Sequence, residues 1–470
     1  MSHQPFRVFR ISNKKDSPKI MSLKRRVLSA GIWSLAGFGA VQVIRFGSNL
    51  IMTRLLAPEM FGLMAISTVV MIGLALFSDL GLRTNIIRSS RGEDPAFLNT
   101  AWIIQIFRGL LLWVAACGVA ASIAIVGHLG TSLGQGIYAD PRLPEILVVL
   151  SFTSVILGFS TTKYFEASRR LSLGRITLIE IVSQIMGILF IFAWLSLDRS
   201  IWALVAGAIC ASLVSTILGH LYLPGVRNRW TWDPAAFREI FHFGKWLFLS
   251  SILGFLAMNG DRLMLGGMTN ATFLGVYSIA FGIVAAIEQV LVRIVASVAF
   301  PAISEIAREH PSKVGDTYYR MHILIAAIAY FCSGTLVVSG QALIGVLYDA
   351  RYAGAGWILE VLAAGLVVIP LQLANYTFLA LGKPWMNSTI SAVRTALLFV
   401  GMPAGFYIFG VEGAIWGLVM SQLLSAPLII MFAVQTRLFA ARREIMVLPM
   451  LAVGFAAGKL FVELVRYWRP

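Results

Sequence analysis

Apolar stretches of about 20 residues recur along almost the whole chain, separated by short polar segments. Stretches of this length predict helices that span a membrane. The predicted spans lie at about 30–55, 61–81, 99–126, 145–163, 174–197, 201–223, 241–263, 275–299, 320–340, 356–381, 386–409, 413–435 and 445–465. Because the segments between them are short, we expect no soluble domain.

The last predicted span, 445–465, is less regular than the others. It contains Lys459 and Glu463, and an odd number of spans places the basic residues Arg466 and Arg469 on the opposite side from the N-terminus. Three interpretations stay open for this segment. It is a genuine thirteenth span, a helix that lies in the membrane interface, or the relic of a longer pair of spans.

The first half of the chain resembles the second half at a fixed spacing. At the far end of the half, Ile201–Val205 (IWALV) returns 214 positions later as Ile415–Val419 (IWGLV). Further matches have a spacing of 213 positions. Two spacings that agree within one residue indicate a duplicated unit, as in many transporters. The other matches, at a spacing of 213, pair Gly31, Trp33, Gly47, Leu50, Gly62 and Ile66 with Gly244, Trp246, Gly260, Leu263, Gly275 and Ile279.

The repeat and the spans divide the chain into five predicted segments. The predicted fold class is an all-α polytopic membrane protein of about 12–14 spanning helices, with two pseudo-symmetric six-helix bundles and a C-terminal helix. The segments are a cytoplasmic basic tail (1–28), an N-terminal six-helix bundle (29–223), a cytoplasmic linker (224–240), a C-terminal six-helix bundle (241–436) and an additional helix with its tail (437–470).

Composition agrees with a membrane protein. Hydrophobic residues make up 58% of the chain, charged residues make up 13%, and the mean hydropathy is +0.81. A soluble protein carries about a quarter charged residues. The formal net charge of +16 would also suit a nucleic-acid partner, so the distribution of the basic residues decides between these interpretations.

Lys and Arg concentrate on one side of the predicted membrane. With the N-terminus in the cytoplasm, the cytoplasmic segments carry 25 of them. This asymmetry predicts a cytoplasmic N-terminus. It also explains the net charge as a topology signal next to anionic membrane lipid, so we expect no nucleic-acid partner. The other side carries five at most, namely Arg54, Arg142, Arg199, Arg262 and Arg351.

Charged residues deep in the predicted spans are candidates for function, because a charge in the lipid core is costly. The basic candidates are Arg45, Arg108, Arg293 and Arg394, and the deepest acid is Glu288. The side chains of Arg108 and Arg293 could instead extend to the interface. Glu288 could neutralise a neighbouring arginine or couple transport to an ion.

Motifs of enzymes are missing from the sequence. There is no Gly-rich phosphate loop that ends in Lys-Ser or Lys-Thr, and there is no His-x-x-x-His pair. Cys117, Cys210 and Cys332 lie in apolar stretches and are not spaced like metal ligands. We therefore expect no catalytic residue, no metal and no cofactor, and we do not expect an enzyme.

Several short motifs follow one another along the chain: Thr53–Leu63 (TRLLAPEMFGL), Asp79–Leu82 (DLGL), Asn259–Gly266 (NGDRLMLG), Leu274–Ser278 (LGVYS) and Val298–Ser304 (VAFPAIS). In this order they resemble the motifs of the polysaccharide transporter (Wzx-like) oligosaccharide flippases. That family belongs to the superfamily of the multidrug and toxin extrusion exporters and the lipid II flippase. The resemblance covers about residues 25–440.

The resemblance implies two six-helix bundles that face each other across a central cavity in a bacterial inner membrane. It implies alternating-access export of a polyprenyl-diphosphate-linked oligosaccharide, as a repeat unit of O-antigen, capsule or exopolysaccharide, from the inner to the outer leaflet. Arginines suit this substrate because they bind diphosphate oxygens through charge-assisted hydrogen bonds. A polysaccharide polymerase and other assembly proteins are candidate partners.

Other polar residues have two interpretations each. Amides such as Gln105 and Gln372 could bind sugar hydroxyls, although such groups more often bond one helix to another. Asp261 and Arg262 fall at the predicted end of the span 241–263, where we expect a helix cap or a loop salt bridge.

Two other functions stay open. A cation-coupled multidrug exporter of the same superfamily would need an acid deep in an early helix, whereas residues 31–57 contain Arg45 and no Asp or Glu. A non-transporting scaffold of polysaccharide assembly would need neither the deep arginines nor a duplicated unit.

Overall fold

The computed structural model describes residues 23–78, 81–89, 91–128, 136–170 and 172–468. Its regular structure in these ranges is helical, without a strand, so the predicted all-α fold class is confirmed. Nine stretches of the described chain are long and apolar enough to cross a membrane, or ten if the bent pair Arg142–Gly158 and Lys163–Arg169 is one span. The protein is therefore a multi-pass membrane protein.

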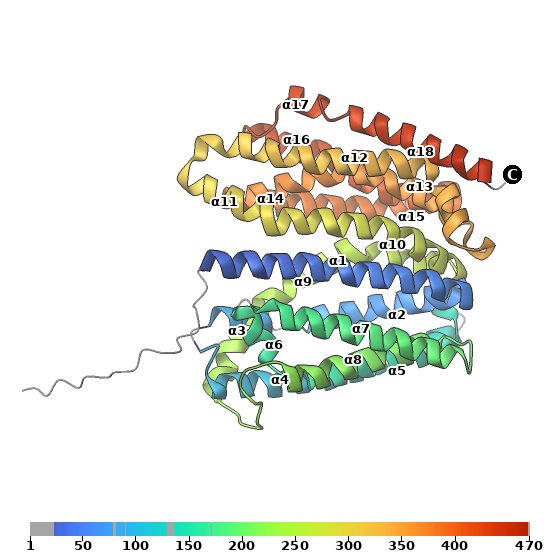
Figure 1. Ribbon diagram of the computed structural model, residues 1–470. Coiled ribbons are helices and arrows are strands. Elements are labelled where there is room, and N and C mark those ends of the chain that lie inside the picture. The colour runs from blue at the N-terminus through green and yellow to red at the C-terminus, as the bar shows by residue number, and fades with distance from the viewer. Residues whose placement is uncertain (1–22, 79–80, 90, 129–135, 171, 469–470) are drawn as a thin grey trace, which may run out of the picture.

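The helices from the first half of the chain lie together in the lower part of Figure 1. Helix α4 packs against α5, α7 packs against α8, and α1 packs against α7. The long helices are α1 (Leu23–Leu55), α2 (Pro58–Phe77), α4 (Pro95–His128), α5 (Arg142–Gly158), α7 (Leu173–Leu195) and α8 (Trp202–Tyr222). The short ones are α3 (Leu82–Arg88), η1 (Gly136–Ala139) and α6 (Lys163–Arg169).

The helices after residue 270 form the upper part of Figure 1, and α9 (Pro234–Met268) connects them to the first half. The long ones are α10 (Ala271–Ile294), α12 (Val314–Leu347), α15 (Pro384–Leu423) and α18 (Pro449–Trp468). The shorter ones are η2 (Val295–Ala299), α11 (Phe300–Glu309), η3 (Pro311–Lys313), η4 (Ala350–Tyr352), α13 (Ala355–Ala364), η5 (Gly365–Leu371), α14 (Gln372–Ala380), α16 (Ala426–Gln435) and α17 (Ala441–Ile445).

Helix α15 is a hairpin whose two arms reverse at Gly410. This glycine has φ 64° and ψ −148°, a conformation that side chains with a Cβ disfavour. Glycines also line the contact between the arms, and a Cβ on Gly405 would lie 2.1 Å from the carbonyl oxygen of Gly413. The turn therefore separates two passes, where the apolar pattern predicted the spans 386–409 and 413–435.

The predicted span 145–163 contains a sharp bend that the apolar pattern did not indicate. Helix α5 ends at Gly158, and the chain bends by 64° before α6 begins at Lys163. The bend frees backbone carbonyls, which need partners in the membrane. The Gln105 side chain of α4 is such a partner. Its amide nitrogen donates to the carbonyls of Leu157, Gly158 and Ser160 at 2.9, 3.2 and 3.1 Å. Gln105 therefore bonds one helix to another.

The two halves touch at the end of the bundle where α1 ends. We name this the Leu56 end, and the opposite end, where residues 223–233 connect the halves, the linker end. Near the Leu56 end, a Cβ on Gly62 of α2 would lie 1.9 Å from the carbonyl oxygen of Ala271. A Cβ on Gly275 of α10 would lie 1.8 Å from the carbonyl oxygen of Pro58. Only glycine allows backbones to approach this closely.

The last helix, α18, lies alongside α12 and ends at the Leu56 end (Figure 1). Together with α17 it forms one of the stretches that can cross a membrane. The structure thus favours a thirteenth span over an interfacial helix. The bounds of the predicted bundles and linker stay predictions.

Candidate functional site

One face of α1 is directed at the second half of the chain. Nearer the linker end, the guanidinium carbon of Arg293 on α10 lies 4.9 Å from the centre of the Phe38 ring. At the other end, the Tyr352 hydroxyl donates a hydrogen bond of 3.2 Å to the carbonyl of Leu56. Leu56 directly follows the last residue of α1, so this contact lies at the end of the helix, and the Phe38 contact marks the face of α1 that looks at the second half.

Arg45 lies on this face between the two contacts. It follows Phe38 by close to two turns, and Gln42 and Asn49 lie about one turn before and after it. The Arg45 side chain is exposed, and its guanidinium forms no hydrogen bond or ion pair with the described residues. A cation in this position can bind an anion that enters between the halves.

Arg293 lies on the facing surface of α10. It follows Gly275, which contacts α2, by five full turns, so α10 directs both residues toward the first half. The half-buried Arg293 packs over Phe38 and interacts electrostatically with Glu180 on α7. Of the predicted basic residues, Arg45 and Arg293 therefore lie on facing surfaces of the two halves.

Arg108 bonds α4 to the end of α2. Its Nε donates to the Ser78 hydroxyl at 3.0 Å, and its Nη2 donates to the carbonyl of Ala75 at 2.7 Å. The Ala75 carbonyl is one of the groups that an α-helix leaves without an intrahelical partner at its C-terminus, and Ser78 is the C-cap residue of α2. The geometry gives Arg108 a structural role at the linker end, and its role in substrate binding stays a prediction.

Arg394 lies on α15, one turn before Leu398. Leu398 and Phe399 pack against Gly260 of α9, so this part of α15 faces α9. The half-buried Arg394 guanidinium forms no hydrogen bond or ion pair within the described part of the chain. Its predicted substrate contact is untested by this geometry.

Glu288 points into the second half rather than toward the first. It lies five positions before Arg293 on α10, which places it on a different face of the helix. The Gln372 amide of α14 donates to its carboxylate at 3.3 Å. No basic side chain pairs with Glu288 among the described residues, so its role in ion coupling stays a prediction.

Asp261 is a buried carboxylate that the sequence placed at a helix end. That prediction is wrong, because α9 continues for about two more turns to Met268. Asp261 is 4% exposed and accepts a hydrogen bond of 2.5 Å from the fully buried Tyr277 hydroxyl of α10. The adjacent Arg262 donates to Asn259 at 3.0 Å and packs over the Phe281 ring. A buried acid in a spanning helix is a candidate for function.

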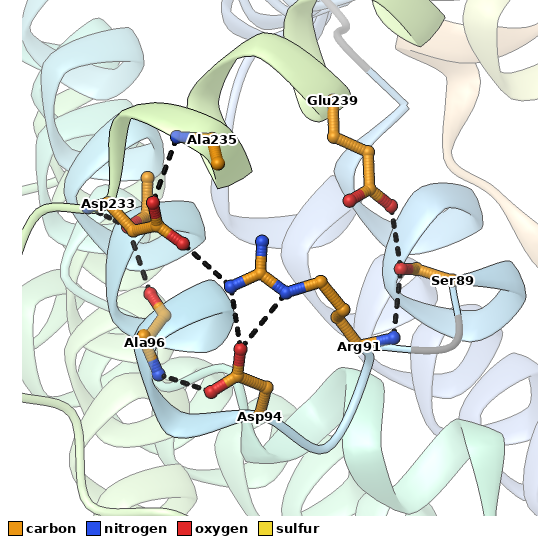
Figure 2. Close-up of polar contacts among 8 residues, drawn as sticks. Ser89, Arg91, Asp94, Ala96, Asp233, Ala235 and Glu239 are labelled. Atoms are coloured by element: carbon orange, nitrogen blue, oxygen red, sulfur yellow. Dashed lines mark hydrogen bonds and ion pairs between the residues drawn. The ribbon is translucent and has the colours of Figure 1, made fainter.

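At the linker end, a set of polar residues attaches α9 to the first half (Figure 2). We name Ser89, Arg91, Asp94, Asp233 and Glu239 the linker clasp. Arg91 Nη2 lies 2.7 Å from Asp94 and 2.6 Å from Asp233, and the Ser89 hydroxyl donates to Glu239 at 2.7 Å.

Asp233 has a second role in the linker clasp, as the N-cap of α9. Its carboxylate accepts a hydrogen bond of 2.9 Å from the backbone of Ala235. The hydrogen bond from Arg91 holds the pKa of the Asp233 carboxyl below its usual value. The first turns of α9 are thus bonded to the first half, and further along the helix α9 packs against both α2 and α15.

Polar contacts also join the halves at the Leu56 end. Arg351 Nη2 donates to the carbonyls of Thr53 and Arg54 at 3.0 and 3.2 Å, and it also pairs with Asp349. The Tyr138 hydroxyl of η1 donates to the carbonyl of Leu263 at 3.0 Å. Within the Arg351–Asp349 pair, the hydrogen bond from Arg351 lowers the pKa of the Asp349 carboxyl. The hydrogen bonds to Thr53, Arg54 and Leu263 hold the two halves together at the Leu56 end.

Groups suited to metals are scattered in the described residues. No set of three or more His, Cys, Asp or Glu side chains there is placed to hold a metal ion. Cys117, Cys210 and Cys332 are all free thiols.

These features define a polytopic membrane protein with two helical halves that meet backbone to backbone at the Leu56 end, are bonded by the linker clasp at the other end, and present basic residues to each other. Residues 51–356 match the family described as "Polysaccharide biosynthesis protein". This match covers more than half of the chain, and the protein belongs to that family. The predicted family of Wzx-like polysaccharide transporters is therefore confirmed.

One relative and two solved structures describe the likeness further. The chain is 21% identical to the lipopolysaccharide biosynthesis protein WzxC of Escherichia coli K12 over 463 residues, which cover 93% of this chain and 89% of the relative. It matches an inward-facing multidrug resistance MATE transporter of the MOP superfamily with a TM-score of 0.64 and 14% identity, covering 95% and 99% of the two chains. It matches lipid II flippase MurJ, inward closed, with a TM-score of 0.64 and 10% identity, covering 93% and 98%.

Proposed function

We propose that this protein flips a polyprenyl-diphosphate-linked oligosaccharide across a bacterial inner membrane by alternating access. The observation that carries the proposal is Arg45, which is exposed and lacks a described partner on the face of α1 that looks at the second half. Membership of the family and the likeness to WzxC support a substrate of polysaccharide assembly.

The chemistry of the head group explains the basic residues. A diphosphate loses water when it enters the protein, and the fork of an arginine replaces that water with charge-assisted hydrogen bonds. Arg45 binds the diphosphate from α1, and Arg293 adds positive charge from α10. The polyprenyl chain stays in the lipid, so the protein needs to enclose only the polar head.

The distribution of Lys and Arg supports one orientation in the membrane. The excess of these residues on one side favours a linker end and an N-terminus in the cytoplasm. The glycine contact of Gly62 and Gly275 then closes the outer side, which suits a state that loads substrate from the cytoplasm. In transport, the halves 29–223 and 241–436 rock against each other, with the linker 224–240 between them.

The membrane potential can drive an anion outward. An inside-negative potential contributes about 2.3 kcal/mol per charge for each 100 mV. Glu288 and Asp261 are the acids available for coupling to a cation, and both lie in the second half. A polysaccharide polymerase that uses the exported lipid is a candidate partner.

Asp261 also favours a second candidate function, a cation-coupled multidrug exporter. A buried acid beside the interface of the halves suits a cationic cargo, and the fold is shared with MATE transporters. Arg45 favours an anionic cargo and the flippase. The two proposals differ in whether a lipid-linked glycan or a cationic drug accumulates when the protein is missing.

The test measures lipid-linked glycan in a strain that lacks the gene, as total amount and as the fraction in the outer leaflet. We expect a polyprenyl-diphosphate oligosaccharide to build up in the inner leaflet. Wild-type protein and Arg199→Ala should restore export, whereas Arg45→Ala should not. Arg199 is the matched control because it is an exposed arginine between α7 and α8, outside α1. Normal glycan exposure together with drug sensitivity would favour the exporter.

A further inference from the structure

Helix α18 uses one of its faces to pack on α12. A Cβ on Gly454 would lie 2.4 Å from the carbonyl oxygen of Phe331, and one on Gly458 would lie 2.6 Å from that of Thr335. The Thr335 hydroxyl also donates to the carbonyl of Gly454 at 3.2 Å. The two helices therefore touch backbone to backbone, and this face of α18 is fully used.

The other face of α18 carries an exposed stripe. Its members are Ala452, Ala456, Lys459 and Glu463, each about one turn after the last. These spacings place all four on one side of the helix, away from the two glycines. Small residues at this spacing allow a further helix to approach closely.

Lys459 lies near the middle of the membrane span. It is the eleventh of the 20 residues of α18, which places it about 15 Å along a helix as long as the hydrocarbon core is thick. A charge that faces lipid at this depth is costly. Tryptophan and tyrosine at the end of the helix, Tyr467 and Trp468, fit the interface there.

Lys459 lacks a counter-charge in the part of the chain that the structure describes. Its ammonium group forms no ion pair with the residues that the structure describes. Glu463, one turn further along, pairs with Arg466 near the end of the helix at 3.1 Å. The stripe thus presents one positive and one negative position, about 6 Å apart along the axis, to whatever lies beside α18.

We propose that the stripe binds α18 of a second copy of this chain. Both copies enter the membrane in the same orientation, so the two helices are parallel and are related by a two-fold axis along the membrane normal. Such an interface is reciprocal. Lys459 of each copy pairs with Glu463 of the other, which removes two uncompensated charges from lipid, while Ala452 and Ala456 let the helices approach.

The position of α18 suits this role. It lies at the edge of the second half, beyond α12, whereas the surfaces of α1 and α10 that face each other lie between the halves (Figure 1). Two copies joined through α18 therefore leave these surfaces free. The proposal stands apart from the proposed function, because it rests only on the charges and packing of the last helix.

The experiment co-expresses two differently tagged full-length copies and measures how much of one copurifies with the other from a mild detergent. The wild-type copies should associate. Lys459→Glu and Glu463→Lys should each weaken self-association about tenfold or more, because like charges then face each other in a medium of low dielectric constant. Arg442→Glu is the matched control, since it makes the same charge reversal on the exposed surface of α17, and it should associate like the wild type.

The decisive sample mixes the two reversed variants. A copy with Lys459→Glu carries two acids in its stripe and a copy with Glu463→Lys carries two bases, so the mixed pair should associate even though neither variant associates with itself. A mixed pair no stronger than the single variants would overturn the proposal. Wild-type copies that stay monomeric in nanodiscs by single-molecule photobleaching would also overturn it, and would leave the stripe to a helix of a different membrane protein.

Discussion

The guanidinium carbon of Arg293 on α10 lies 4.9 Å from the centre of the Phe38 ring on α1, so a side chain of the second half contacts a side chain of the first. This contact lies nearer the linker end than the glycine contact of Gly62 and Gly275. This contact establishes which face of α1 looks at the second half. The same face carries Arg45 two turns further on. Substitutions on this face and at the contacts around it therefore test the candidate site.

Substitutions of Arg45 and Arg108 should have different effects, one on export and the other on the stability of the fold. Arg45→Ala removes a guanidinium without a described partner, so stability should change by less than about 0.5 kcal/mol. Export should fall about ten- to a hundredfold, the equivalent of about 1.5–3 kcal/mol for a charged hydrogen bond. Arg108→Ala should lower the melting temperature, because Ala75 and Ser78 lose their charged hydrogen bonds to α4. Equal melting temperatures for both variants would contradict this assignment.

Gly62→Ala should hold the halves apart at the Leu56 end. Its Cβ would lie 1.9 Å from the backbone of Ala271, an overlap that costs about 1–3 kcal/mol. A cysteine introduced at Tyr352 should become more reactive toward a membrane-impermeant thiol reagent. Gly47→Ala is the control, because nothing lies within 4 Å of a Cβ there. Unchanged labelling in Gly62→Ala would show that the end is not held by this contact.

Tyr277→Phe should destabilise the second half. Removing the hydroxyl leaves the buried Asp261 carboxylate without the partner seen at 2.5 Å, which costs about 1–3 kcal/mol. Asp261→Asn should cost less, since the amide oxygen still accepts the bond. Thermal unfolding in detergent checks the order of these two variants. Tyr407→Phe, which changes a side chain that is 91% exposed, should unfold like the wild type.

The stability of the linker clasp should change with pH only under acidic conditions, where Asp233 becomes protonated. The pKa of Asp233 is lowered by Arg91, so the pair contributes fully above the ordinary carboxyl pKa of about 3.9 and loses its contribution as the pH falls through the lowered value. Hydrogen exchange at the amide of Ala235 should therefore stay protected from about pH 5 to 8 once the intrinsic rate is corrected.

Two variants of Asp233 test this account of the linker clasp. Asp233→Asn keeps an N-cap but loses the pair with Arg91, so exchange at Ala235 should rise less than in Asp233→Ala. A loss of protection between pH 5 and 8 in the wild type would point to a different group.

The spans were readable from the sequence, and their irregularities were not. Apolar stretches of the right length gave the two passes on either side of Gly410. The bend after Gly158 escaped detection because its freed carbonyls are satisfied by Gln105, which lies on another helix far back along the chain. Asp261 was misplaced for a related reason, since its apolar stretch ends at a charge although the helix continues to Met268.

The sequence by itself determined the class of protein, because spanning a membrane requires long apolar stretches and the positive-inside asymmetry is a matter of counting. It also singled out the deep arginines, since a charge in an apolar stretch is costly wherever the helix packs. Only the tertiary structure decided that Arg45 faces the other half, that Arg108 bonds α4 to α2, and that Lys459 lies on an open face of α18. Those roles depend on which side of a helix meets a neighbour, and that is set by contacts between residues distant in the chain.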